Sequence, residues 1–298
     1  MKIAVLSNVR TPTLPDSPWG LGNSLHAIAT GLARRGHTVT LFAGHGSEFE
    51  AGRLVTHSQE QYRLRANAFD ALLDGSHAHT LSIEQPEWPV VNRVGDSECE
   101  WTPPRVVVAT QFMAQRYPGC RVVPAGVDVN AIPFDEKGGG YLAFMGVLHP
   151  LKGPQRAARV ADMVQRELRL AGPAAGGMSA EGEHLGVLEG QARWRFLGGA
   201  YALLAPSVHD AAPRTPLEAA ACGTPTLCLD GDGTQEHVEH CVSGFVCADE
   251  DDMADALYDV PRLPRARVRE WAAATHGLEQ MIDGYEKALA DAAAGVAW

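Results

Sequence analysis

The sequence lacks the features that mark membrane-spanning, zinc-binding and disulfide-rich secreted proteins. No apolar run approaches the roughly 18 residues that a membrane-spanning helix needs. The six cysteines contain no CxxC pair, and several lie in apolar runs. This pattern indicates buried free thiols in a reducing cytoplasm rather than disulfides or a zinc site. Residues 1–6 show no signal-peptide pattern, so we expect a cytoplasmic protein that does not insert stably into a membrane.

Clusters of basic residues are also missing. The formal net charge is −11 at pH 7, whereas a protein that binds nucleic acid needs a basic surface. We therefore expect no nucleic-acid partner. The length of 298 residues fits two domains of about 140 residues each, and a hydrophobic content of 45% suffices for two cores.

Short apolar segments alternate with helical patterns along the whole chain. Strands are expected at residues 2–6, 38–43, 71–73, 89–94, 106–109, 121–123, 141–147, 167–171, 183–188, 200–204, 226–229 and 244–247. Helices are expected at residues 20–36, 60–68, 111–117, 155–165, 190–197, 215–222, 249–258, 265–274 and 278–293. This alternation predicts an α/β protein with parallel sheets. Charge and glycine interrupt the pattern near residues 135–140, so we expect an N-terminal domain at 1–137 and a C-terminal domain at 138–276.

The most informative stretch covers residues 205–236 and reads APSVHDAAPRTPLEAAACGTPTLCLDGDGTQE. It begins at the end of an apolar strand, and a helix then opens near Pro216, a residue that the first helical turn tolerates. Gly223 ends this helix, and a second apolar strand follows. Free backbone N–H groups at the start of the helix suit a phosphate or an anionic sugar group. The carboxylates of Asp210 and Glu218 suit sugar hydroxyls.

A related pattern lies at the N-terminus. The strand at residues 2–6, a glycine-rich turn with Gly20 and Gly22, a helix and the strand at residues 38–43 form a nucleotide-type βαβ pattern. The two glycines do not make a GxGxxG motif. They are interpreted either as a loop that contacts phosphate or as a tight turn only.

A loop with two histidines follows the strand at residues 71–73. It contains Asp74, His77 and His79. Two histidines at i and i+2 can bind a metal, but no cysteine or acidic ligand has a convincing spacing, so a metal site is disfavoured. We expect contacts with an acceptor substrate, and solvated loop histidines are the alternative.

Residues 205–236 resemble the signature of the retaining GT-B glycosyltransferases of family 4. The residues that carry the resemblance are Pro206, Ser207, Asp210, Glu218 eight positions further on, Gly223, Thr224, Pro225 and Glu236. An ordinary parallel-sheet crossover with a solvated glutamate is the alternative. The resemblance implies a GT-B fold, in which two Rossmann-like domains have parallel sheets that face a central cleft. It also implies that residues 277–298 return to the N-terminal domain as a final helix.

The resemblance implies transfer of a sugar from a nucleoside-diphosphate sugar, with retention at the anomeric carbon and with no metal or other cofactor. Lys152 matches a lysine that grips the donor diphosphate, whereas Val147 stands where the family has an arginine. Arg214 is an additional cation in the signature loop, and we expect it to offset that loss. With Arg214 added, the residues expected to bind the donor are Gly20, Gly22, Lys152, Arg214, Thr215, Pro216, Leu217 and Glu218.

The residues implied in catalysis are Asp210, Asp96 and Lys152. Glu218 is expected to hold the donor ribose, and Asp210 is expected to lie beside the donor sugar. Asp210 has a shorter side chain than the family's usual glutamate, and Asp96 stands where the family has a histidine. The residues expected on the acceptor side are Asp74, His77 and His79.

Other functions stay open from the sequence. A binding protein of the same fold without transferase activity would explain Val147, Asp210 and the missing histidine near Asp96. A sugar-nucleotide epimerase of this fold would need further catalytic carboxylates and histidines, which the sequence does not offer at recognisable positions. The sequence shows no Lys/Arg-rich amphipathic helix that would bind a membrane, so a small soluble acceptor is favoured over a lipid.

We predict that turnover does not require a divalent metal. Asp230-Gly231-Asp232 is the nearest match to a metal-binding Asp-x-Asp motif, but it lies in the loop before Glu236, where the resembled family needs no metal. In a sugar-transfer assay, EDTA is expected to leave the rate unchanged. Complete loss of turnover in EDTA that Mg²⁺ or Mn²⁺ restores would contradict this prediction.

Overall fold

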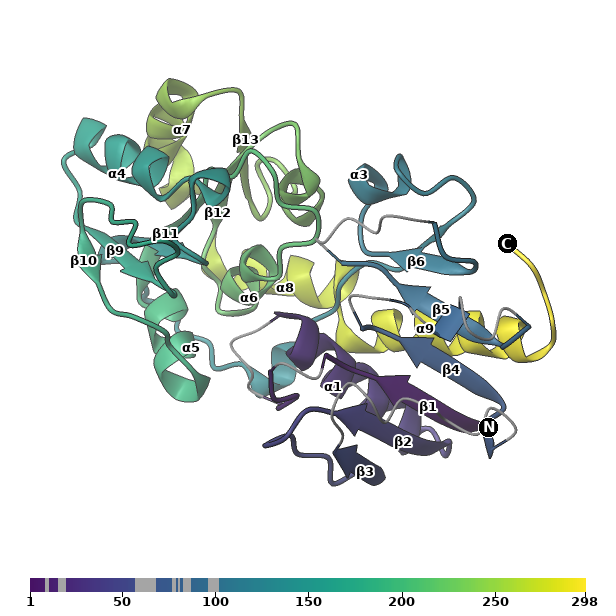
Figure 1. The fold of residues 1–298 in the computed structure, drawn as a ribbon. Coiled ribbons are helices and arrows are strands. Elements are labelled where there is room, and N and C mark those ends of the chain that lie inside the picture. Colours follow the sequence, from purple (N-terminus) through teal and green to yellow (C-terminus); the bar gives the residue numbers. More distant parts are fainter. Residues whose placement is uncertain are drawn as a thin grey trace. The chain divides into compact units, whose positions relative to one another are not determined.

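The computed structural model describes residues 1–8, 11–15, 20–56, 68–76, 79, 81–82, 87–95 and 102–298. The chain forms two compact units (Figure 1). The first unit consists of Met1–Gly126 together with Leu278–Trp298, and the second consists of Val127–Gly277. Residues 127–137 thus pack with the second unit. The predicted domain boundaries at residues 137 and 276 stay predictions.

A seven-stranded parallel sheet forms the centre of the first unit. Its strands are β1 (Lys2–Leu6), β2 (Thr38–Ala43), β3 (Arg53–Thr56), β4 (Ala71–Asp74), β5 (Val90–Arg93), β6 (Val106–Val108) and β7 (Arg121–Val122). They lie in the order β3-β2-β1-β4-β5-β6-β7, and every neighbouring pair is parallel. Helices α1 (Gly20–Arg34), α3 (Gln111–Ala114) and α9 (Leu278–Ala293) accompany this sheet.

The apolar composition of the strands explains why most of them were predictable. Four of the five β1 residues and all β4 residues are buried, as expected for parallel strands that are covered on both faces. The sequence did not predict β3, because its apolar residues Leu54 and Val55 are only half-buried and the strand lies at the edge of the sheet. Most of the helix predicted at residues 60–68 lies outside the described residues.

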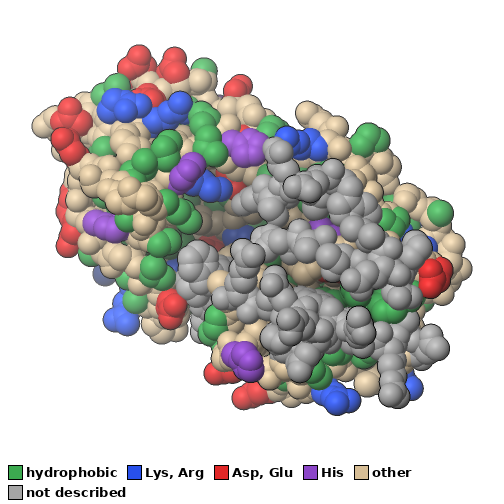
Figure 2. Space-filling view, in the orientation of Figure 1, with side chains coloured by type: hydrophobic (Ala, Val, Ile, Leu, Met, Phe, Trp, Pro, Cys, Tyr) green, Lys and Arg blue, Asp and Glu red, His purple; other side chains and the backbone are tan. Residues whose placement is uncertain are grey.

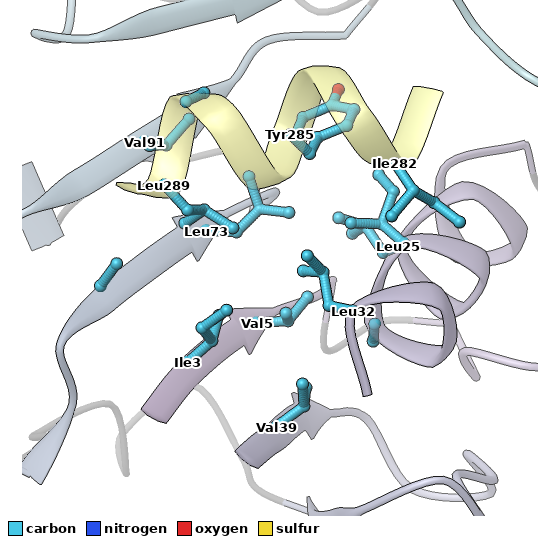
Figure 3. Close-up of a cluster of buried hydrophobic side chains, with 14 of the residues drawn as sticks. Ile3, Val5, Leu25, Leu32, Val39, Leu73, Val91, Ile282, Tyr285 and Leu289 are labelled. Carbon is cyan, nitrogen blue, oxygen red and sulfur yellow. The ribbon is translucent and has the colours of Figure 1, made fainter. Parts of the chain in front are cut away.

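Helix α9 contributes to the core of the first unit. Figure 3 shows Leu289 and Ile282 of α9 beside Leu73 of β4 and Leu25 of α1. All four side chains are fully buried in one hydrophobic cluster. Gly31 of α1 permits the close approach of the two helices, because a Cβ atom there would lie 2.0 Å from Ile282 Cδ1. The last helix and the first helix therefore share one core.

A six-stranded parallel sheet forms the centre of the second unit. Its strands are β8 (Tyr141–Met145), β9 (Leu168–Ala171), β10 (Glu183–His184), β11 (Ala200–Ala205), β12 (Thr226–Leu229) and β13 (Gly244–Cys247). They lie in the order β10-β9-β8-β11-β12-β13, with parallel neighbours throughout. The helices are α4 (Pro154–Met163), α5 (Gly190–Gly198), α6 (Thr215–Ala221), α7 (Glu250–Ala256) and α8 (Arg265–Thr275), with 3-10 turns η3 (Val129–Ala131), η4 (Pro150–Lys152), η5 (Gly233–His237) and η6 (Leu257–Arg262). The predicted α/β class with parallel sheets is confirmed.

The strand order reverses at one point in each sheet. β1 lies between β2 and β4, and β8 lies between β9 and β11. In open α/β sheets, ligands bind beyond the carboxyl ends of the strands at such a reversal. The loops after β8 and β11 contain Lys152 and Asp210. The topology therefore brings these two predicted site residues to one edge of the second sheet.

The described surface of the second unit carries charges of both signs. Acidic and basic side chains are interspersed on the face drawn in Figure 2. Among the helices that the structure describes, none has both the length and the apolar character needed to cross a bilayer. The longest of these helices, α9, has 16 residues.

We predict that Ile282→Ala lowers the free energy of unfolding by about 2–5 kcal/mol, because it removes a fully buried side chain and leaves a cavity in the core of the first unit. Lys287→Ala is the matched control. Lys287 is exposed on the same helix, and a change within about 0.5 kcal/mol is expected there. Denaturant unfolding followed by circular dichroism measures both values. Equal stability of the two variants would contradict the role of α9 in the core.

Candidate functional site

Lys152 and Asp210 form an ion pair at the carboxyl edge of the second sheet. The Nζ atom of Lys152 lies 2.6 Å from Oδ2 of Asp210, and the two side chains are 27% and 13% exposed. Gly153 allows the loop after β8 to pack closely on the loop after β11. Its φ is +76°, and a Cβ atom there would lie 2.3 Å from the carbonyl oxygen of Pro206. The structure thus brings two of the predicted catalytic residues into contact.

Asp232 fixes the backbone around Asp210. Asp232 is 1% exposed, and its carboxylate accepts hydrogen bonds from Ser207 Oγ at 2.7 Å, from the Asp210 N–H at 2.9 Å and from the Thr234 N–H at 2.8 Å. The Gly233 N–H donates to the Asp210 carbonyl at 2.9 Å. Because both backbone polar groups of Asp210 are bonded to residues 232–233, the position of this residue depends on Asp232.

Glu218 is buried between two arginines. Its side chain is 2% exposed, and Oε2 accepts a hydrogen bond from Nη2 of Arg193. Nε of Arg214 lies 3.7 Å from Oε1 of Glu218, and the Arg214 side chain is 11% exposed. The alternative in which Glu218 is solvated does not fit this burial. Arg214 also lies largely out of solvent, and its predicted contact with a diphosphate stays a prediction.

Sequence reasoning missed Arg193 and Asp232. Arg193 shares a face of α5 with Phe196 and Leu197, which follow it at i+3 and i+4 and are buried. This helical spacing would have marked Arg193 as a buried cation in need of a partner. Asp232 was considered only as part of Asp230-Gly231-Asp232, the nearest match to a metal-binding motif. Aspartate is also a preferred N-cap residue, and Asp232 caps η5 by accepting the Thr234 N–H.

The first turn of α6 contains three further residues predicted to bind the donor, Thr215, Pro216 and Leu217. Pro216 and Leu217 are buried, and Thr215 is half-buried. Pro216 lies at the start of the helix, where its missing N–H costs no intrahelical hydrogen bond. The structure confirms a helix that begins at Thr215, and the donor contacts of its first turn stay predictions.

Two arginines of α8 hold the other end of α6. Arg269 donates to the carbonyl of Ala221, and Nη2 of Arg265 lies 2.7 Å from Oγ1 of Thr224. The last carbonyls of a helix have no partner within it, and nearby cations stabilise them. Burial lowers the pKa of Arg265 below its usual value. These contacts fix α6, and with it Glu218, relative to α8.

His237 is a buried neutral residue near the site. It is 1% exposed, and its ring centroid lies 5.3 Å from that of His276. Burial lowers the pKa of His237 to about 3, with additional lowering by His276 and Arg214. Neither ring nitrogen of His237 has a hydrogen-bond partner among the described residues. His237 is therefore uncharged at neutral pH and adds no charge beside Arg214.

The remaining predicted site residues belong to the first unit. Asp74 is fully buried at the end of β4, where Oδ1 accepts hydrogen bonds from the N–H and the Oγ of Ser76 at 2.8 Å and 2.6 Å. Nδ1 of His79 lies 3.9 Å from the same oxygen. Burial raises the pKa of Asp74, and His79 partly opposes this effect. Asp74 and His79 are thus close together, and their contact with an acceptor stays a prediction.

Four predicted site residues remain. Two of them lie in the first turn of α1, and the other two lie outside the described part of the chain. Gly20 and Gly22 belong to the first turn of α1, and their contact with a donor phosphate stays a prediction. His77 and Asp96 lie outside the described residues. Within the described ranges, no group of three or more His, Cys, Asp or Glu side chains is arranged to hold a metal ion.

The fold places the protein in a known structural class. The crystal structure of AviGT4, a glycosyltransferase involved in avilamycin A biosynthesis, matches with a TM-score of 0.83 at 20% identity, over 100% of this chain and 99% of that one. Anabaena HepE in complex with UDP matches with a TM-score of 0.72 at 16% identity, over 98% and 100% of the two chains. These similarities confirm the predicted GT-B fold with two parallel α/β sheets. A central cleft between the sheets stays a prediction.

The part of the chain that matches a known protein family lies in the second unit. Residues 140–260 match the family described as glycosyl transferases group 1, and this match confirms the predicted resemblance. The chain is also 27% identical, over 274 residues, to the D-inositol 3-phosphate glycosyltransferase of Mycolicibacterium smegmatis (strain ATCC 700084 / mc(2)155). That match covers 72% of this chain and 62% of the relative, so the chain spans less than two thirds of the length of that curated protein.

We predict that Asp232→Ala lowers the free energy of unfolding by about 1–3 kcal/mol, because three donors that bond its buried carboxylate lose their acceptor. Asp230→Ala is the matched control in the same loop, since Asp230 is exposed. We expect a change within about 0.5 kcal/mol for this control. Thermal or denaturant unfolding compares the two variants, and a loss that is the same for both would show that Asp232 does not hold the loop.

Proposed function

We propose that this protein is a glycosyltransferase that moves a sugar from a nucleoside-diphosphate sugar to a hydroxyl of a small acceptor, with retention at the anomeric carbon and without a metal. Two observations on the part of the chain that matches the family carry the proposal: the ion pair of Lys152 with Asp210 beyond the ends of β8 and β11, and the buried Glu218 carboxylate of α6. The comparisons support it, because the mycobacterial relative is named as a glycosyltransferase and HepE has been solved with UDP and with UDP-glucose.

Lys152 and Arg214 bind the donor diphosphate in this proposal. As the bond between the anomeric carbon and the phosphate oxygen breaks, negative charge grows on the leaving group, and fixed cations stabilise that charge. Lys152 is held by Asp210, and Arg214 lies beside Glu218. Both cations are therefore held before the donor arrives. The main chain at Thr215, Pro216 and Leu217, with the Gly20 and Gly22 turn, completes the proposed diphosphate site.

The two acidic residues of the signature recognise hydroxyl groups of the donor. An ionised carboxylate accepts about four hydrogen bonds, so Asp210 is able to bind both Lys152 and a hydroxyl of the donor sugar. Glu218 likewise keeps acceptor positions for the ribose. The Asp210 N–H donates to the Asp232 carboxylate, and the Gly233 N–H donates to the Asp210 carbonyl. These bonds and the short side chain of Asp210 fix how far its carboxylate reaches.

The first unit supplies the acceptor side in this proposal. Asp74, His77 and His79 are its proposed contacts, and Asp96 is proposed to act near the reacting sugar. The buried pair of Asp74 and His79 supports this assignment, because a buried carboxylate beside a histidine can orient the imidazole toward a hydroxyl. The described cysteines are free thiols, which is consistent with a reducing compartment such as the cytoplasm.

A second candidate function is a nucleotide-sugar-binding protein of the same fold without transferase activity. The observation in its favour is Val147, an apolar residue where the family has an arginine, together with the engagement of Lys152 by Asp210. A binding protein would bind a nucleoside-diphosphate sugar and release it unchanged. Incubation with a donor sugar, followed by chromatography of the nucleotide, separates the two functions.

We predict that Glu218→Ala weakens the binding of a nucleoside diphosphate about tenfold or more, because charged hydrogen bonds to the ribose are lost. Glu189→Ala, at an exposed position before α5 with no side-chain capping bond, is the control. Isothermal titration calorimetry with UDP, GDP and dTDP measures the effect. Unchanged affinity in a folded Glu218→Ala protein would remove Glu218 from the donor site.

We predict that Lys152→Ala and Arg214→Ala each lower turnover about 10- to 150-fold, the equivalent of a lost charge-assisted hydrogen bond of roughly 1.5–3 kcal/mol. The reason is that both cations stabilise the charge that grows on the leaving diphosphate. Lys137→Ala, at an exposed position of the same unit, is the control. If Arg214→Ala keeps the unmodified rate and donor affinity while Lys152→Ala does not, the diphosphate site has a single cation.

A further inference from the structure

Arg193 is a buried cation on a helix whose other buried residues carry no charge. It is 7% exposed, and the other buried residues of α5 are Phe196, Leu197 and Gly198. An arginine is rarely buried unless it is paired. The partner of Arg193 is Glu218, which lies 25 residues further along the chain and is itself 1% exposed. The two residues therefore depend on each other for burial.

The position of Arg193 relative to Glu218 is fixed by the packing of α5 against the end of α6. Oγ1 of Thr224, just after α6, donates to the Leu197 carbonyl at 2.7 Å. The Sγ atom of Cys222 lies 3.8 Å from the Trp194 carbonyl. Both contacts attach the last turns of α5 to the end of α6, the helix that contains Glu218. The orientation of the Glu218 carboxylate is thus set by two helices rather than by one.

The two guanidinium groups approach different oxygens of the same carboxylate. Arg193 bonds Oε2, and Arg214 lies 3.7 Å from Oε1. An ionised carboxylate accepts about four hydrogen bonds, so acceptor positions are left on both oxygens. A ribose presents two adjacent hydroxyl donors, which match a carboxylate that is held in one orientation.

We propose that Arg193 is a positioning residue that orients Glu218 for a ribose diol, so that the site selects ribonucleoside diphosphates over their deoxy counterparts. This inference rests on the proposed function, because it assumes that Glu218 faces the nucleotide of the donor. A glutamate with three rotatable side-chain bonds loses conformational freedom when it binds a ligand. Arg193 removes that freedom in advance, which is the general effect of preorganisation on affinity.

Two other roles of Arg193 predict different behaviour. If Arg193 contacted the diphosphate itself, its loss would weaken the binding of ribonucleotides and of deoxynucleotides by the same factor. If it only stabilised the fold, its loss would lower the melting temperature and leave the preference among nucleotides unchanged. Only a role through Glu218 makes the ratio of the two affinities depend on Arg193.

The test measures that ratio by isothermal titration calorimetry. The probes are UDP, GDP and ADP with their 2′-deoxy and 3′-deoxy counterparts, and the proteins are the unmodified chain, Arg193→Met, Arg193→Lys and Arg195→Met. Arg195 is exposed on the same helix, so Arg195→Met is the matched control. Arg193→Lys keeps the charge but lacks the planar fork of the guanidinium group. If Arg193→Met does not fold, the affinity ratio of Arg193→Lys decides the test.

We expect the unmodified protein to bind a ribonucleotide roughly tenfold more tightly than at least one deoxy counterpart, because a site built for a hydroxyl leaves its buried acceptor unpaired when that hydroxyl is missing. Arg193→Met is expected to reduce this ratio to about 1–2, Arg193→Lys to an intermediate value, and Arg195→Met to leave it unchanged. A ratio that is unchanged in Arg193→Met, or in Arg193→Lys when Arg193→Met is unfolded, would overturn the inference.

Two results separate this inference from the proposed function. If the unmodified protein binds a nucleoside diphosphate but shows no preference for the ribose form, the role of Arg193 is wrong and the proposed transferase activity is unaffected. If the unmodified protein binds none of the nucleotides, both proposals are wrong.

Discussion

The burial of the Glu218 carboxylate between two guanidinium groups is the constraint on which the candidate site depends. A carboxylate is costly to remove from water unless cations and hydrogen bonds replace its hydration. Arg193 comes from α5 and Arg214 from the residue before α6. The packing of these helices and the pairing of their charges therefore have to form together. Removal of either arginine would leave part of the buried charge of Glu218 uncompensated. The pairing therefore requires α5 and the start of α6 to be held close together.

The same logic holds at the neighbouring loops. Asp232 accepts hydrogen bonds from the loop that contains Asp210, and Asp210 in turn pairs with Lys152 from the loop after β8. Three loops or turns that follow β8, β11 and β12 are thus connected through side-chain carboxylates. The parallel sheet supplies their common edge, and the strand order reverses at β8. Ligands of open α/β sheets bind beyond the carboxyl ends of the strands at such a reversal.

Much of the fold was predictable because buried parallel strands are nearly continuous apolar runs. The edge strand β3 (Arg53–Thr56) was missed, since it has only two apolar residues and both are half-buried. Glu218 was predicted as a site residue from the spacing of the family signature, and Lys152 from its match to the family's lysine that grips the donor diphosphate. Arg193 was missed because its pairing with Glu218 spans 25 positions and exists only once α5 packs against α6. Asp232 was missed because the N-cap preference of aspartate was not applied to it, and because its bond with the Asp210 N–H spans 22 positions.

The most direct test of the account is whether the protein breaks the bond between a sugar and a nucleoside diphosphate. The purified chain would be incubated with UDP-, GDP-, ADP- and dTDP-glucose in water. The nucleotides would be followed by ³¹P and the released glucose by ¹H nuclear magnetic resonance. Water is a poor acceptor, so we expect slow release of the nucleoside diphosphate from at least one donor, with glucose first appearing as the anomer present in that donor. If every donor stays intact and none perturbs the thermal unfolding of the protein, the account of a nucleotide-sugar transferase is contradicted.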